Sequence, residues 1–478
     1  MNLPPCRWGL WRYIGWGLPV LKYITMKYIR KISVFSFLFW GVWACFHSAH
    51  AANHYVRQGA TGNGSDWTNA YGNLPDSLTR GDTYYISDGS YGGYTFDDAN
   101  SGTSVITVKK AIAVDHGTDT GWNSGYGDGQ AVFGGFTFAT DYWVIDGSTR
   151  NEGRWNDGPS YGIKTSGVAT NYFWFGHAAD NVTLKYLDIG SDYGDSDNES
   201  YGDGVYLGGF AEAVENWLVQ RSYIHNVRTA AQHAGVHNVI YEYNFIGPNW
   251  SKSGIRHQVR GSSVTIRHNI FRNACQGHVS DPTAGYSCTA IVGWYGNAGS
   301  NMEDYTNSAV YGNLFIDTVG GVFYNGMIAI GDDRTSQGGG PQDCTGCKVF
   351  NNTFVGMGRT NTDSVISIGG GGIITNTEIR NNAWYNIGNH TPTCQAAVCS
   401  NNPVIANANA FVNALAENFH LSASGSAGIG DTLGPPYNLD PDGNTRGADG
   451  TWDIGAYEYV SGGSDTTPPG APGGLSVR

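Results

Sequence analysis

The chain repeats a short pattern of apolar and polar positions, of the form apolar-x-apolar-x-x-Asn-x-apolar. The apolar positions before the Asn are two residues apart, which is the period of a strand with one buried face. Copies that recur at variable spacing predict a solenoid, in which stacked coils share a constant core and differ in their loops. The pattern begins at residues 182, 217, 239, 264, 308, 347 and 377.

Alignment of the copies gives three columns. We expect two of them to point into the core, one three residues before the Asn and one two residues after it. The first contains Leu184, Val219, Tyr241, Ile266, Val310, Val349 and Ile379. The second contains Ile189, Ile224, Ile246, Phe271, Phe315, Phe354 and Trp384. The Asn column contains Asn244, Asn269, Asn313, Asn352 and Asn382.

An Asn at a bend can bond its own backbone and tolerates left-handed backbone geometry, and stacked Asn side chains can bond to one another along the axis. Such a column resembles the asparagine ladder of right-handed parallel β-helices, the fold of the pectate lyase-like proteins. The resemblance covers nearly all of residues 53–460. It implies an all-β protein, a right-handed parallel β-helix solenoid.

A solenoid needs covered ends, because an open end exposes strand edges and core. We predict an N-terminal cap over residues 52–101, with a short helix over 74–78 and the first strand over 81–86. The β-helix is predicted over 102–460, and residues 418–421 and 453–459 resemble closing segments of this class. Residues 461–478, rich in Gly, Ser, Pro and Thr, are predicted to be a linker toward a missing fibronectin type III-like module.

Composition supports extended structure and limits the partners. Of 478 residues, 70 are Gly and only 14% are charged, which excludes a coiled coil. Six of the 27 Lys and Arg residues lie in the first 51 residues, which hold no acid, so 21 basic residues face 40 acidic ones in the remainder. This balance argues against nucleic acid as a partner and leaves room only for a local basic patch. We expect a monomer that binds an acidic polysaccharide.

The first 51 residues are predicted to be an upstream extension plus a signal peptide. Lys27, Arg30 and Lys31 precede the apolar stretch 32–45, and residues 49–51 offer a cleavage site, so we expect export and a mature start near Ala52. The stretch is shorter than the ~20 residues of a membrane span. Lipoprotein processing at Cys45 is the alternative.

Six cysteines remain after the leader, and an even number in an exported chain favours disulfides. We predict nearest-neighbour pairs, with a zinc site as the alternative. The pairs are Cys275 with Cys288, Cys344 with Cys347, and Cys394 with Cys399.

A further strand is predicted ahead of each repeat, and its outward residues recur about 4.8 Å apart along the stack. A row of this kind suits a linear polymer, and its polar, cationic and aromatic residues favour an anionic glycan. The outward candidates are Tyr206, Gln232, His233, Arg256, His257, Gln258, Arg260 and Trp294.

The segment 255–260 resembles the Arg-His strand of the alginate lyase and chondroitinase B family. The resemblance implies a polysaccharide lyase that works by β-elimination, with Arg256 as the neutralising residue. The Lys that the family uses is not at the expected position. His233 on the preceding strand is our prediction for the base, and Lys252, just before the Arg strand, for a substrate contact. The alternatives are core or turn histidines and surface ion pairs of the arginines.

A cluster of carboxylates suggests a Ca²⁺ site, because calcium prefers six to eight oxygen ligands. A solvated acidic loop is the alternative. The residues are Asp192, Asp195, Asp197, Glu199 and Asp203. Arg267 and Glu242 occupy equivalent positions on neighbouring coils, so we assign them to a structural ion pair.

Two other functions remain open at this stage. A non-catalytic surface protein that binds glycan or cell wall is one, since solenoids also serve as adhesins and a fold does not determine function. A β-helix glycoside hydrolase is the other, although the paired-Asp and Gly-His-Gly motifs of the polygalacturonases are not apparent.

Overall fold

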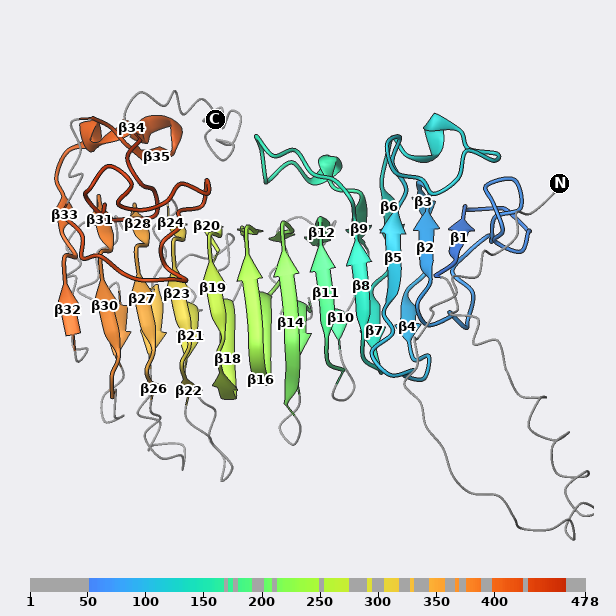
Figure 1. The fold of residues 1–478 in the computed structure, drawn as a ribbon, viewed down its shortest axis with the longest axis horizontal. Helices are drawn as coiled ribbons and strands as arrows, with labels where there is room; N and C mark the ends of the chain where they lie inside the picture. The colour runs from blue at the N-terminus through green and yellow to red at the C-terminus, as the bar shows by residue number, and fades with distance from the viewer. Residues whose placement is uncertain are drawn as a thin grey trace, which may run out of the picture. The chain divides into compact units, whose positions relative to one another are not determined.

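The computed structural model describes residues 51–166, 171–174, 179–190, 202–208, 213–248, 253–274, 290–294, 305–317, 327–330, 344–356, 366–368, 375–387, 398–423 and 429–460. These residues form three rows of short parallel strands that stack along one axis (Figure 1). The predicted all-β, right-handed parallel β-helix is confirmed. Within the described ranges there is no helix both long enough and apolar enough to cross a bilayer.

Successive coils add strands to these rows. The leading row contains β4 (Tyr94–Phe96), β7 (Phe136–Phe138), β10 (Asn171–Trp174), β13 (Asp203–Leu207), the first part of β16 (Thr229–Glu242), the first part of β18 (Ser253–Ser262), β21 (Ala290–Trp294), β25 (Ile328–Ile330) and β29 (Ile366–Ile368). The central row contains β1 (Asn53–Val56), β2 (Thr83–Ile86), β5 (Ile106–Lys110), β8 (Trp143–Asp146), β11 (Val182–Lys185), β14 (Val214–Gln220), the second part of β16, β19 (Thr265–Arg267), β23 (Ala309–Tyr311), β27 (Lys348–Phe350), β30 (Glu378–Arg380) and β32 (Val398–Ser400).

The third row contains β3 (Gly89–Ser90), β6 (Ala131–Phe133), β9 (Ile163–Thr165), β12 (Leu187–Gly190), β15 (Tyr223–His225), β17 (Phe245–Ile246), β20 (Ile270–Arg272), β24 (Leu314–Ile316), β28 (Thr353–Val355), β31 (Ala383–Tyr385) and β33 (Val404–Ile405). The short strands β22 (Tyr305–Thr306) and β26 (Cys344–Thr345) continue the pairing from the end of β18.

Both predicted apolar columns lie in the core. Their members are at most 2% exposed, in agreement with the alternation of the repeat. The aromatic rings of the second column stack along the axis, with 4.7 Å between the centroids of Phe271 and Phe315 and 4.8 Å between those of Phe315 and Phe354. The core is therefore continuous from coil to coil, as a solenoid requires.

The predicted asparagine ladder lies at the bend between the central and third rows. The side-chain oxygen of Asn313 accepts hydrogen bonds from the backbone nitrogen of Asn269 at 2.9 Å and from its side-chain amide at 3.0 Å. The same pair of bonds joins each ladder Asn to the next, and the ladder continues to Asn402. These bonds satisfy buried polar groups and hold each coil to its neighbour.

The left-handed backbone geometry falls on the residue before each ladder Asn rather than on the Asn itself. Tyr243 and His268, for example, both have φ of 55°. The ladder Asn itself turns its side chain inward and bonds along the stack.

The N-terminal part of the stack differs in one element from the prediction. The strand expected over 81–86 is confirmed as β2, and β1, β2 and β5 pair in parallel within the central row. The short helix expected over 74–78 is wrong, since these residues form no helix. Pro75 lies inside this segment and supplies no backbone N–H.

The C-terminal segment folds back over the outside of the third row (Figure 1). Its strands β34 (Phe411–Asn413) and β35 (Asn418–Leu421) pair antiparallel. Phe411, Phe419 and Ile454 pack on outward side chains such as Ile270 and Leu314, and this forms a second core. Arg272 on β20 and Glu417 reinforce the contact with a two-pronged ion pair at 2.9 Å.

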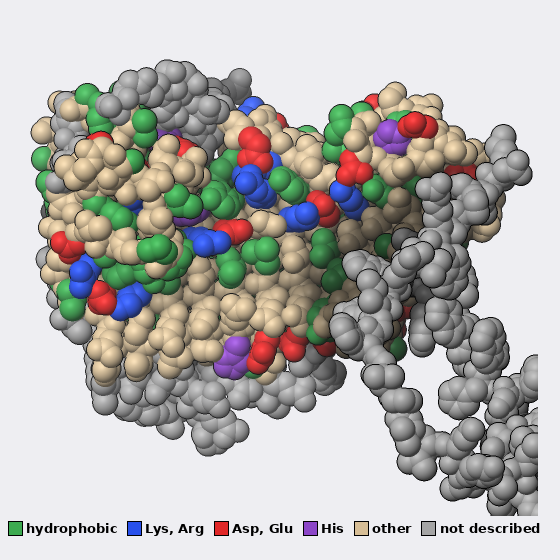
Figure 2. Space-filling view, in the orientation of Figure 1, with side chains coloured by type: hydrophobic (Ala, Val, Ile, Leu, Met, Phe, Trp, Pro, Cys, Tyr) green, Lys and Arg blue, Asp and Glu red, His purple; other side chains and the backbone are tan. Residues whose placement is uncertain are grey.

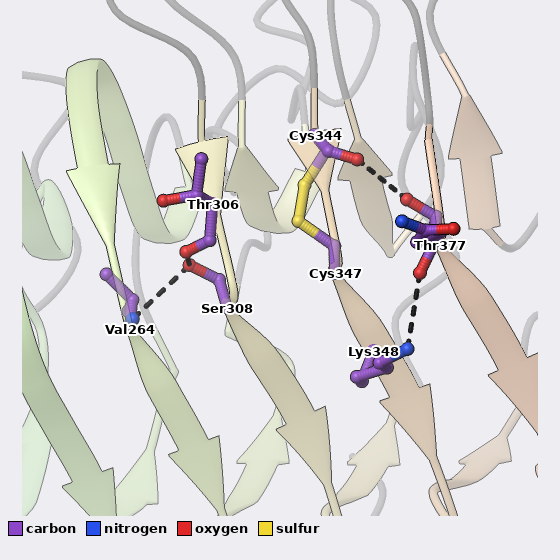
Figure 3. Close-up of a disulfide and its surroundings, with 8 residues drawn as sticks. Val264, Thr306, Ser308, Cys344, Cys347, Lys348 and Thr377 are labelled. Atoms are coloured by element: carbon purple, nitrogen blue, oxygen red, sulfur yellow. Dashed lines mark hydrogen bonds between the residues drawn. A yellow bond between two sulfur atoms is a disulfide. The ribbon is translucent and has the colours of Figure 1, made fainter.

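The disulfide between Cys344 and Cys347 is confirmed (Figure 3). Both cysteines are fully buried, and Thr377 of the next coil donates a hydrogen bond to the Cys344 carbonyl at 2.7 Å. Cys399 is also disulfide-bonded. Cys275, Cys288 and Cys394 lie outside the described residues.

Ion pairs join neighbouring coils on the outer side of the central row, where acidic and basic side chains alternate (Figure 2). The predicted pair of Arg267 with Glu242 is confirmed, with the arginine Nε 2.8 Å from the carboxylate. Lys185 pairs with Asp146 at 3.0 Å in the same way.

We expect Asn313→Ala to lower the free energy of unfolding by about 2–5 kcal/mol, because it leaves the buried backbone N–H of Asn269 without an acceptor and removes the bonds that the Asn313 amide donates to the Ile266 carbonyl and to Asn352. Urea unfolding at constant pH measures this. The control is Asn407→Ala, an exposed Asn whose side chain makes no cap hydrogen bond, for which we expect a change within about 0.5 kcal/mol. Equal effects of the two substitutions would contradict a structural role of the ladder.

The buried carboxyl group of Glu458 is expected to make the stability of the protein depend on pH. It is 5% exposed, and burial, with the nearby Asp453 carboxylate, raises its pKa from 4.5 to about 7. The folded state therefore binds a proton that the unfolded state releases, and stability falls as pH rises from about 4.5 to about 7.

We expect Glu458→Gln to remove this part of the decline. Thermal melts of both proteins at several pH values between 4.5 and 8 measure it, and the difference between the two curves isolates Glu458 from other titrating groups. Parallel curves would contradict the assignment.

Candidate active site

One column of residues in the leading row has a register that is continuous over several coils, and its members Thr95, Thr137, Tyr206 and Gln232 are at least partly exposed. Successive members are paired across parallel strands, so residues far apart in the chain lie on adjacent rungs. The column contains Thr95, Thr137, Trp174, Tyr206, Gln232, Arg256, Gly293, Ala329 and Ser367.

Tyr206 and Gln232 form the described centre of this column. Both are partly exposed, whereas their strand neighbours Val205 and Ala231 are fully buried. Burial and the Asp203 carboxylate raise the pKa of Tyr206, while a hydrogen bond with the Gln232 side chain acts in the opposite direction. The Tyr206 hydroxyl therefore stays protonated at neutral pH and offers a hydrogen bond rather than a base.

Arg256 follows Gln232 in the same column, on β18. The next rungs are Gly293 and Ala329. The column thus changes from large polar residues to residues with little or no side chain. The register pairs Tyr206 with Gln232 and Gln232 with Arg256 on successive strands.

His233 was expected to lie on this outer side, and that is wrong. Its side chain is fully buried, its Nε2 lies 2.7 Å from the Tyr241 hydroxyl, and the two rings stack. Strand alternation explains the difference, because Gln232 next to it is the outward residue. A glycan outside the solenoid does not reach a fully buried imidazole, so His233 is not the base.

His257 and Trp294 belong to the register column of His233 and not to that of Arg256. The members of that column whose burial is described, Leu207, His233 and Ile330, are buried. Arg256, His257, Gln258 and Arg260 were expected in one outer row. The register instead places Arg256 and His257 in different columns.

β18 also contains one residue more than its neighbour. His233 pairs with His257, but Gly235 pairs with Arg260, so an irregularity falls at Gln258 or its neighbour. Such bulges occur preferentially next to active sites, where they redirect the chain.

Asp203 does not fit the predicted calcium ligand. It is fully buried, and Arg228 binds it through two hydrogen bonds of 3.1 and 2.9 Å. A carboxylate neutralised in this way is poorly available to a metal ion. The described residues contain no group of three or more potential metal ligands. Asp192, Asp195, Asp197, Glu199 and Lys252 lie outside the described residues.

Two residues of this region were not predicted. Trp174 is the register neighbour of Tyr206, and Arg228 is the partner of Asp203. Each lies one coil away from its partner, and Arg228 is 25 residues after Asp203. The sequence did not reveal this, because the leading strands carry no repeated Asn that would align one coil with the next.

The comparisons with known proteins concern the fold. No family model and no curated protein matches the chain. The crystal structure of pectate lyase Pel9A aligns with a TM-score of 0.50 at 14% identity, over 86% of this chain and 97% of its own. The chain shares its fold with a pectate lyase.

Two further solved structures align less closely. An alginate lyase from Paenibacillus sp. str. FPU-7 has a TM-score of 0.38 at 13% identity, over 69% of this chain and 93% of its own. PfbA, a surface adhesin of Streptococcus pneumoniae, has a TM-score of 0.36 at 12% identity, over 64% of this chain and 77% of its own.

We expect Arg228→Ala to lower the free energy of unfolding by about 3 kcal/mol, because it removes the two hydrogen bonds and the positive charge that Arg228 supplies to the buried Asp203 carboxylate. The double variant Asp203→Asn/Arg228→Ala should recover part of this loss, as urea unfolding will show. If Asp203 were a calcium ligand instead, Asp203→Asn alone would abolish a calcium-dependent rise in Tm.

Proposed function

We propose that the protein is an extracellular polysaccharide lyase that cleaves uronate-containing glycans by β-elimination. The observation that carries the proposal is the register column of the leading row, which aligns Tyr206, Gln232 and Arg256 on successive rungs. A linear glycan lying along the stack meets these residues in turn. Arg260, His257 and Trp294 lie on the same strands as this column, β18 and β21, and no separate role in binding is proposed for them.

Arg256 has the chemistry that the first step needs. A base removes the proton on the carbon beside the uronate carboxylate, and the guanidinium stabilises the charge that then develops on the carboxylate oxygens. The bond to the glycosidic oxygen breaks, a double bond forms in the sugar ring, and the departing oxygen takes up a proton. The reaction therefore needs neither an oxidant nor a water molecule.

The base in this proposal is Lys252, which precedes β18 by one residue. His233 is replaced in this role because it is buried. A lysine acts as a base when burial or neighbouring positive charge lowers its pKa.

The shared fold with a pectate lyase supports the proposal, because it shows that a β-helix of this kind accommodates chemistry on an acidic glycan. The excess of acidic residues does not oppose it, since binding needs only a local cationic group. Residues 26–51 are proposed to direct export, with cleavage near Ala51–Ala52, and the mature protein is proposed to be a monomer.

Asp203 is left out of the proposed calcium site, because Arg228 already binds its carboxylate. The remaining proposed ligands are Asp192, Asp195, Asp197 and Glu199. Activity measured before and after treatment with a chelator, with calcium and magnesium added back separately, decides whether this loop takes part.

We expect the purified protein to release unsaturated uronate from at least one of alginate, pectate and the glycosaminoglycans, followed by ultraviolet absorbance. Arg256→Ala should lower kcat by about 10²–10³ with little change in Tm, because it removes charge stabilisation in the transition state. The matched control is Arg154→Ala, which removes an exposed arginine of a distant loop and should leave kcat unchanged.

Absence of unsaturated product on every acidic glycan, or full activity of Arg256→Ala, would overturn the proposal. Glycan binding without cleavage would then favour the non-catalytic surface protein, and new reducing ends without ultraviolet absorbance would favour a hydrolase.

A further inference from the structure

A cavity lies away from the leading row, at the bend between the central and third rows. Its volume is about 290 Å³, at the lower end of the ~300–1,000 Å³ usual for small-molecule pockets. Three aromatic rings, two carboxylates and one guanidinium line it. The side chains that supply these groups belong to Glu152, Trp155, Arg221, Tyr243, Asp442 and Tyr457.

One wall is the segment 150–161, which a buried arginine holds in place. The Arg150 side chain is fully buried and donates to the Tyr243 carbonyl at 2.6 Å and to the Glu152 carboxylate at 2.8 Å. Its guanidinium lies 4.1 Å from the centre of the Trp155 ring. The Trp155 indole donates to the Glu152 carbonyl at 3.0 Å. Both Glu152 and Trp155 are thus fixed before any ligand binds.

The floor of the cavity is formed by residues that have left-handed backbone geometry and directly precede the ladder positions. Arg221 and Tyr243 occupy these positions on successive coils, with φ of 49° and 55°, and both are partly exposed. Arg221 pairs with Glu152 at 3.0 Å and lies 5.1 Å from the Tyr243 ring centre. The Tyr243 hydroxyl bonds to His268 at 3.0 Å.

The opposite wall is the C-terminal segment. Asp442 is exposed and pairs with His420 at 2.7 Å, and the His420 ring lies 3.8 Å from the ring of Tyr457. The cavity therefore exists only because the C-terminal segment folds back over the coils.

We propose that this cavity binds one unit of a neutral sugar. Aromatic rings offer an apolar surface to the C–H face of a sugar ring, while carboxylates and a guanidinium bond its hydroxyl groups. The carboxylates of Glu152 and Asp442 balance the two arginines, Arg150 and Arg221, so the cavity has no surplus positive charge to attract a uronate. Preorganised side chains reduce the entropic cost of binding. The site is separate from the proposed lyase site and does not depend on lyase activity.

The experiment is calorimetric titration of Arg256→Ala, which keeps the cavity intact, with neutral monosaccharides and disaccharides and with the corresponding uronates. We expect a neutral sugar to bind with a one-to-one stoichiometry, and Trp155→Ala to weaken binding more than 10-fold. Asp442→Asn, a surface change that keeps the backbone bond to Asp440, should weaken it at least 3-fold, so the test does not rest on a tryptophan variant that fails to fold.

The matched control is Asp119→Asn. Asp119 is an exposed carboxylate that pairs with His116 at 2.8 Å, and His116 stacks on Trp122, as Asp442 pairs with His420 beside Tyr457. Its substitution should not change the affinity. Absence of binding by every neutral sugar, preference for uronates, or insensitivity to Asp442→Asn would overturn the proposal, whether or not the protein is a lyase.

Discussion

The hydrogen bonds between stacked asparagines are the interaction on which the rest of the structure depends. From Asn269 to Asn402, each ladder Asn receives both a backbone and a side-chain donor from the ladder Asn of the coil before it, and from Asn244 to Asn382 these groups are buried, where an unpaired donor is costly. In the coils that carry the ladder, from Asn244 to Asn402, the strand register follows from this alignment, because a slip by one residue would turn the apolar columns outward.

The same register explains what lies outside the core. It aligns Tyr206, Gln232 and Arg256 in one column, pairs Arg267 with Glu242, and gives the third row an apolar outer side that the C-terminal segment covers. Two surfaces with different chemistry result. The leading row carries a polar column with an arginine, and the bend beneath the C-terminal segment forms a preorganised aromatic cavity.

The fold and the core could be predicted from the sequence because the repeat marks inward residues directly, as with Val310 and Phe315. The leading strands lack such a marker, and this is why His233 was placed on the wrong side of its strand. The ion pair of Asp203 with Arg228 was missed because it joins consecutive coils. The covering role of Phe411 and Phe419 depends on tertiary packing that no local pattern records.

The most direct test of the account is a crystal structure of Arg256→Ala in complex with an acidic oligosaccharide. The account predicts an oligosaccharide that runs parallel to the stack, with consecutive sugars beside Tyr206, Gln232 and residue 256, above an unbroken ladder from Asn244 to Asn402. An oligosaccharide bound only elsewhere on the protein, or Tyr206, Gln232 and residue 256 out of register with one another, would contradict it.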